Sequence, residues 1–122
     1  MGVGACRPKR MKGGKMPYYM VQVAYTSETW DVLVKNPQNR AEAVVPVIQK
    51  LGGKIFGAWI SFGEYDIVGI FQMPDNVSAA SVSMAFASGG ACKSVKTTPL
   101  LTMQEGMEAM SRARGTGYIP PK

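Results

Sequence analysis

Two adjacent segments that are apolar at almost every position constrain the fold more than any other feature of this sequence. Residues 54–61 and 65–73 have the composition of strands, and only the short loop Phe62-Gly63-Glu64 separates them. Strands joined so closely form an antiparallel hairpin, because a parallel crossover needs about a dozen residues or more. Both alternating registers of these strands are apolar, which indicates that both faces of the sheet are buried.

The segments on either side of this hairpin predict two further strands and a final helix. Residues 18–25 are rich in aromatic and β-branched residues, as in a first strand, and residues 92–98 form a polar strand suited to a sheet edge. Thr102 and Glu105 have capping-box spacing and open a helix that ends near Arg114. Its methionines at 103, 107 and 110 are typical of a core or an adaptable interface.

Three more helices are placed by capping residues and by apolar residues at helical spacing. Ser27 is expected to cap a short helical turn, and Asn36-Pro37 to open a second helix that Gly52-Gly53 ends. Residues 74–76 offer the caps of a third helix, which Gly89-Gly90 ends. The buried stripes are expected to be Val44, Val47, Ile48 and Leu51 in the second helix and Val77, Ala80, Met84 and Ala87 in the third.

The resulting order is β-α-β-β-α-β followed by an extra C-terminal helix, which predicts an α+β, ferredoxin-like sandwich. In this fold the helices that connect the strands all cover the same face of the sheet. Because the other face is also apolar and one chain has no second helical layer for it, a second copy is expected to cover it. The sequence therefore predicts a homodimer packed sheet to sheet.

The positive charge of the chain lies mainly outside the predicted domain. The 122 residues carry a net charge of +6. Residues 1–15 have five bases and no acid, residues 111–122 have three bases, and residues 16–110 have six bases and eight acids. We expect a disordered basic extension over residues 1–15, a folded domain over 16–113 and a flexible tail over 114–122. Charge confined to the ends is weak support for nucleic-acid binding.

Several functional classes are excluded by composition. The chain has no histidine, which excludes Ser-His-Asp and Cys-His catalysis and histidine-ligated metals. Its two cysteines, Cys6 and Cys92, are too few for a four-thiolate site. No segment approaches the roughly 20 apolar residues of a membrane span, and residues 1–15 lack the apolar run of a signal peptide. We expect no cofactor, no nucleic-acid or membrane partner, and a cytoplasmic location.

Six ordered segments between Met16 and about Met110 resemble the small bacterial GYD-domain family: MPYYMVQVAY, NRAEAV, KLGGKI, FGEYDIVGIF, MPDN and VKTTPL. The name-giving element corresponds to residues 63–66, Gly-Glu-Tyr-Asp. The resemblance implies a ferredoxin-like subunit of the dimeric α/β-barrel type. The family has no securely established activity, so the resemblance predicts the fold and not the function. Lys96 stands where the family usually has arginine, so a bidentate anion contact there would become a single-point contact.

Candidate functional residues gather at the hairpin turn. Asp66 or Glu64 can act as a base and Tyr65 as a proton donor. The same residue types also suit a turn, where Asp66 accepts backbone N–H groups or pairs with Arg40 or Lys96.

Aromatic and polar residues on the predicted strands offer further candidates. Tyr19, Tyr25, Trp59 and Tyr65 either line a ligand cleft between the sheet and the helices or belong to the core and the dimer interface. Lys96 and Thr97 on the last strand either bind an anion or protect a polar sheet edge.

Three functions therefore stay open. The first is a small dimeric module that binds a small, partly apolar molecule between the sheet and the helices. Its candidate ligand-binding residues are Arg40, Trp59, Glu64, Tyr65, Asp66, Lys96 and Thr97. The second is a cofactor-free isomerase, decarboxylase or oxygenase, in which Asp66 is the base and Tyr65 the polarising donor. The third is a purely structural oligomerisation module.

Overall fold

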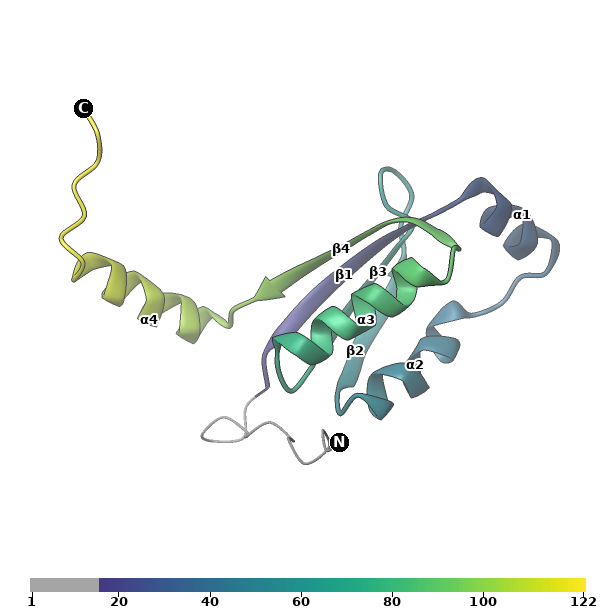
Figure 1. Cartoon of the computed structure of the whole chain (residues 1–122), viewed down its shortest axis with the longest axis horizontal. Coiled ribbons are helices and arrows are strands. Elements are labelled where there is room, and N and C mark those ends of the chain that lie inside the picture. Colours follow the sequence, from purple (N-terminus) through teal and green to yellow (C-terminus); the bar gives the residue numbers. More distant parts are fainter. Residues whose placement is uncertain (1–15) are drawn as a thin grey trace.

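The computed structural model describes residues 16–122, so the expectation of a disordered extension over residues 1–15 lies outside the described residues. A four-stranded antiparallel sheet in the order β2-β3-β1-β4 carries helices on one face (Figure 1). The strands are β1 (Tyr18–Tyr25), β2 (Lys54–Ile60), β3 (Ile67–Gln72) and β4 (Cys92–Leu100). The helices are α1 (Ser27–Lys35), α2 (Arg40–Lys50), α3 (Asn76–Ser88) and α4 (Met103–Arg114). The predicted α+β, ferredoxin-like fold is confirmed.

The β2–β3 hairpin has the predicted antiparallel pairing, with a longer loop than expected. The Ser61 N–H donates to the Asp66 carbonyl oxygen at 2.8 Å, and the Ser61 hydroxyl donates to the Tyr65 carbonyl oxygen at 2.8 Å. These bonds close a loop of their own, so Tyr65 and Asp66 precede β3 instead of starting it. At the other end of the sheet, β4 continues past its predicted end to Leu100, because an edge strand tolerates Pro99.

Two helix starts differ from the predictions. Thr26 caps α1, its hydroxyl accepting the Thr29 N–H at 3.1 Å, whereas Ser27 is the first helical residue. Asn36 ends α1 by donating its N–H to the Val32 carbonyl oxygen at 2.9 Å, so Asn36-Pro37 does not open α2. Asn39 caps α2 instead.

The core lies between the sheet and the helices. Its buried residues are Tyr19, Val21, Val23, Tyr25, Ile48, Phe71, Met73, Ala79 and Val82. The predicted stripe of α2 is confirmed around Ile48, which is fully buried, with Val44 and Leu51 packed beside it. Gly52 ends this helix region with a φ of 89°, a left-handed conformation that favours glycine.

The predicted buried stripe of α3 is wrong. Val82 is 0% exposed and Ala79 is buried, whereas Val77 is 77% exposed and Met84 also faces solvent. The residues of α3 are apolar or small all round and none is charged, so the sequence does not distinguish its two faces. A contact between the Ser83 and Thr97 hydroxyls joins the buried side of α3 to β4.

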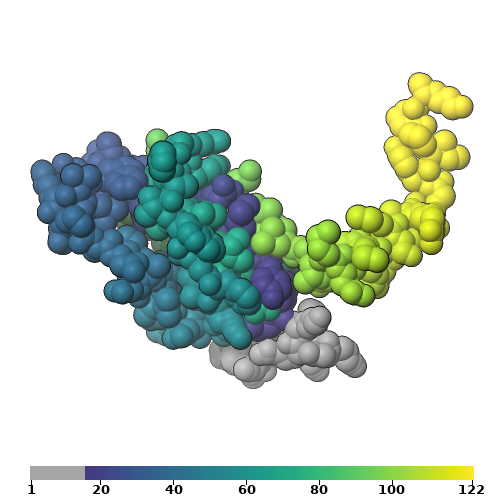
Figure 2. Space-filling model, turned by 180° about the vertical axis from the view of Figure 1, so that it is seen from behind, coloured from purple at the N-terminus to yellow at the C-terminus, as the bar shows by residue number. Residues whose placement is uncertain are grey.

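The opposite face of the sheet carries no helix (Figures 1 and 2). We call it the open face. Over β2 and β3 its side chains are mainly apolar, with Phe56 and Trp59 of β2, Val68 and Ile70 of β3 and Met20 of β1, whereas toward β4 the register places Gln22 beside Lys96 on the same face. Phe56 and Trp59 are more than half exposed, and the Phe56 ring contacts the Tyr18 ring edge-on at 5.2 Å.

The C-terminal helix α4 extends away from the domain beyond the end of β4 (Figure 1). Its predicted capping box is confirmed: the Glu105 N–H donates to the Thr102 hydroxyl at 3.0 Å, and the Thr102 N–H donates to the Glu105 carboxylate at 2.8 Å. Its methionines are exposed, so they are not part of this chain's core. Within residues 16–122 no helix has both the length and the apolar character needed to cross a membrane.

Candidate functional site

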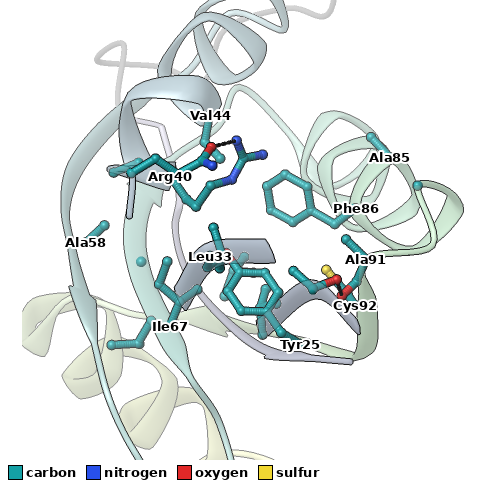
Figure 3. Close-up of a pocket in the computed structure, with 18 of the residues that line it drawn as sticks. Tyr25, Leu33, Arg40, Val44, Ala58, Ile67, Ala85, Phe86, Ala91 and Cys92 are labelled. Carbon is teal, nitrogen blue, oxygen red and sulfur yellow. Dashed lines mark hydrogen bonds between the residues drawn. The ribbon is translucent and has the colours of Figure 1, made fainter. Parts of the chain in front are cut away.

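A cavity of about 410 Å³ lies between the sheet and the helices (Figure 3). Strands β1, β2 and β3 form its floor, while α1, α2 and α3 surround it. Its walls are mainly apolar, with Leu33, Val44, Ile55, Ile67, Phe71 and Phe86 among the lining residues. The volume falls in the range of small-molecule sites, roughly 300–1,000 Å³.

The cavity exists because two neighbouring floor positions have almost no side chain. Ala58 of β2 and Gly69 of β3 are register partners, and both line the cavity. A Cβ atom added at Gly69 would meet only the Gly57 carbonyl oxygen, at 3.7 Å. Larger residues here would fill the space under the helices, as the other floor residues do. The sequence carries this signal as two small residues inside bulky apolar strands, a signal our sequence reasoning did not use.

Arg40 is the one charged residue among the cavity-lining residues that the structure describes. It is the first residue of α2, and in Figure 3 its side chain lies at the cavity beside Phe86. One guanidinium nitrogen, Nη1, donates to the Gln38 side-chain oxygen at 3.1 Å. The ion pairs of residues 16–122 are Lys35–Asp31 and Arg112–Glu108, so Arg40 has no carboxylate partner there.

Two weakly acidic groups line the same cavity. Burial raises the pKa of the Tyr25 hydroxyl above its ordinary value, and the nearby charge of Arg40 partly opposes this shift. Burial also raises the pKa of the Cys92 thiol, again opposed by Arg40. Both groups are therefore protonated and neutral at neutral pH, which leaves the cavity with the positive charge of Arg40 alone.

Asp66 joins three parts of the chain instead of facing the cavity. Its Oδ2 atom accepts the backbone N–H of Tyr25 at 2.8 Å and the indole N–H of Trp30 at 3.2 Å. Its own N–H donates to the Val23 carbonyl oxygen at 2.8 Å. The carboxylate thus ties the β2–β3 loop to the end of β1 and to α1. This geometry matches the second role considered above for Asp66, in which its carboxylate accepts hydrogen bonds that hold the turn in place.

The other predicted site residues do not gather around Asp66. Glu64 is exposed in the β2–β3 loop, and Lys96 is exposed on β4. Thr97 uses its hydroxyl on Ser83 of α3. Trp59 lies on the open face over Gly57.

A second, shallower hollow of about 340 Å³ lies beside the first, and Arg40 and Tyr25 line both. Of the predicted site residues, Arg40 and Trp59 are the two that line this hollow, although the Trp59 ring itself packs over Gly57. Tyr25, one of the aromatic residues expected in either a ligand cleft or the core, lines the larger cavity, and the polar lining residues that were not predicted are Thr29, Gln38 and Cys92. Within residues 16–122, no group of three or more acidic or cysteine side chains is placed to hold a metal ion.

Comparison with known protein families gives one match that covers most of this domain. The model of the GYD domain matches residues 19–110. This chain belongs to the GYD-domain family. The match spans the four strands, α1 to α3 and most of α4.

One related protein carries a functional name. It is a Thermus thermophilus protein named "Glutamine synthetase and cystathionine beta-lyase binding protein". It is 26% identical to this GYD-domain chain over 80 residues, which are 66% of this chain and 84% of that protein.

Solved structures with similar folds share little sequence with this chain. The crystal structure of MtbAldR has a TM-score of 0.53 and 13% identity, over 82% of this chain and 65% of that chain. The structure of PH0061 has a TM-score of 0.45 and 13% identity, over 82% of this chain and 64% of that one. This chain therefore spans just under two thirds of either structure. The likeness to MtbAldR supports the fold alone.

Proposed function

We propose that this GYD-domain protein is a small homodimeric binding module whose cavity takes up a small, partly apolar molecule. The observation that carries the proposal is the cavity itself, an apolar space of about 410 Å³ left by Ala58 and Gly69. A well-packed core leaves few voids larger than a water molecule. A space of this size, with one charged residue in its wall, has the character of a ligand site.

The homodimer is proposed from the open face. Its β2–β3 half exposes the large apolar side chains of Phe56 and Trp59, and apolar patches of this kind are rare on monomers that have no partner. A second copy offers an identical apolar face, which is self-complementary about a two-fold axis. The cavity lies on the other side of the sheet, so dimerisation leaves it accessible.

Binding of a neutral fluorescent dye, N-phenylnaphthylamine, tests the cavity directly. We expect the dye to bind the full chain and to be excluded by Gly69→Val, which fills the floor of the cavity. Filling a void also stabilises a fold, by roughly 0.5–2 kcal/mol, so lost binding with unchanged or higher stability separates exclusion from misfolding.

Gly106→Val is the matched control, because an added Cβ at Gly106 meets nothing within 4 Å and this residue does not line the cavity. Ala58→Val is a second filling variant at the register partner of Gly69. Equal dye binding by the wild type and both filling variants would disprove uptake into the cavity.

A second candidate function is binding to another protein. The name of the Thermus thermophilus relative favours it, and so do the exposed Met103, Met107 and Met110 of α4, since methionine-rich surfaces suit adaptable interfaces. Size-exclusion chromatography with glutamine synthetase or cystathionine beta-lyase from the same host is the test. Co-elution that Met107→Asp abolishes would support this candidate, and separate elution would reject it for those enzymes.

A further inference from the structure

The chemistry of the cavity wall constrains what kind of molecule it can hold. Apart from Arg40, the lining residues that the structure describes are apolar or carry neutral polar groups. A ligand that fills this space must therefore present an apolar body to Leu33, Phe86 and the strands. Whatever charge it carries must be matched at Arg40.

Arg40 is suited to an anion because its charge is not used within the described domain. Its guanidinium donates to the neutral side chain of Gln38, and it also lies against the neutral Tyr25 hydroxyl, so neither neighbour balances its charge. It stands at the first position of α2, where the positive end of the helix dipole adds to its own charge. Guanidinium groups bind carboxylates with two parallel hydrogen bonds.

The same wall disfavours a ligand that also carries an ammonium group. No carboxylate lines the cavity among residues 16–122, and the nearby carboxylate of Asp66 is already bonded to Tyr25 and Trp30. An ammonium group enclosed here would lose water without gaining an acidic partner, which is costly. Because Arg40 supplies one positive charge, it can balance one negative charge on the ligand but not two.

We infer that the cavity selects small organic monocarboxylates with an apolar body and without an ammonium group, held through Arg40. This inference rests on the proposed function, because it requires that the cavity bind a small molecule at all. It adds the chemical class of the ligand, which the size of the cavity alone does not define.

A displacement assay with three matched competitors tests the inference. Hydrocinnamate, its neutral amide and phenylalanine share one phenyl body, and they differ in the carboxylate and the ammonium group. Each competes with N-phenylnaphthylamine bound to the full chain. We expect hydrocinnamate to displace the dye at about one tenth of the concentration that the amide or phenylalanine needs, given the usual strength of hydrogen bonds to charged groups.

Arg40→Gln is expected to remove this preference while leaving displacement by the amide unchanged. Arg112→Gln is the matched control, since Arg112 pairs with Glu108 on α4 and does not line the cavity. High salt should also weaken the preference, because Arg40 is exposed to solvent.

The outcomes separate the two proposals. If the dye does not bind, the proposed function fails. If it binds and all three competitors displace it equally, or if Arg40→Gln keeps the preference, the cavity stands and the carboxylate inference is overturned. If phenylalanine competes as well as hydrocinnamate, the exclusion of an ammonium group is overturned.

Discussion

At the scale of single residues, Asp66 shows how a motif that suggests catalysis serves the fold. Its carboxylate accepts two hydrogen bonds, from the Tyr25 backbone and the Trp30 indole. Asp66 thereby holds the end of β1 and α1 next to the cavity wall that Tyr25 and Leu33 form. The aspartate of the family element thus stabilises the segments that carry Tyr25 and Trp30.

Replacing Asp66 is therefore expected to destabilise the domain. Asp66→Ala leaves two donors without their acceptor and should lower the free energy of unfolding by about 2–3 kcal/mol. Asp66→Asn keeps an acceptor oxygen and should cost less. Urea denaturation measures both, with the exposed Glu64→Ala as a control from the same loop. A change within about 0.5 kcal/mol for Asp66→Ala would contradict this role.

The cavity thiol gives a second prediction at this scale. Burial raises the pKa of the Cys92 thiol above that of a free cysteine, and the charge of Arg40 opposes the shift. The pH midpoint of Cys92 alkylation should therefore lie above that of a free cysteine and should rise further when Arg40→Gln removes the charge. Peptide mass spectrometry measures the alkylation rate of Cys92 at each pH, with alkylation of Cys6 in the same sample as an internal reference. A midpoint that does not move in Arg40→Gln would place Arg40 away from the thiol.

The sign of the linked effect on stability follows from the same shift. A thiol with a raised pKa in the folded state keeps its proton longer there than in the unfolded chain. The stabilising contribution of this thiol is complete at pH values below its pKa in the unfolded chain. It is lost as the pH rises through its pKa in the folded protein. The buried hydroxyl of Tyr25 acts in the same direction at still higher pH. Unfolding free energy should therefore fall in alkaline solution.

At the scale of elements, the rotation of α3 decides which residues form the core. The buried side carries Ala79 and Val82, and it is joined to β4 by the Ser83–Thr97 contact. The outward side carries Val77 and Met84, which an apolar periodicity alone would place inside.

Two identical substitutions on α3 test this rotation. Val82→Ala removes fully buried methyl groups and should lower the free energy of unfolding by about 2 kcal/mol. Val77→Ala makes the same change at a residue that is 77% exposed, and it should shift stability by less than about 0.5 kcal/mol. Thermal or urea unfolding compares the two variants. Equal losses would contradict the observed orientation.

The elements also show what the sequence could and could not predict. Runs of apolar and β-branched residues, a capping box and paired glycines are local signals. The strands, α4 and the end of α2 were therefore predicted well. The face of α3 was missed because an uncharged helix carries no amphipathic signal. Arg40 was predicted as a site residue from its charge. A cleft between the sheet and the helices was predicted, but its floor was not, because the pairing of Ala58 with Gly69 depends on strand register across a hairpin containing an irregularity.

At the scale of the whole molecule, the sheet separates two surfaces with different roles. The helix side holds the cavity, and the open face holds Phe56 and Trp59 for the proposed dimer. Two residues separate the end of β4 at Leu100 from the start of α4 at Met103, and α4 extends beyond the end of this strand (Figure 1).

The proposed dimer predicts an effect of charge on the open face. Phe56→Asp places a carboxylate in the apolar centre of the interface and should convert a dimer to a monomer in analytical ultracentrifugation. Because Phe56 is 58% exposed in the single chain, the domain itself should stay folded. Phe62→Asp makes the same change at a loop residue that is 97% exposed, and it should leave the dimer intact. A monomeric wild type at micromolar concentration would contradict the dimer.

The central claim is that the cavity under the helices holds a small apolar molecule. Native mass spectrometry of the full chain, purified from its own host under gentle conditions, tests it most directly. We predict a mass above that of the bare protein by one small organic molecule per chain, and the bare mass for Gly69→Val prepared in the same way. The same bound mass on both proteins, or no bound mass on the wild type in the presence of added N-phenylnaphthylamine, would contradict the claim.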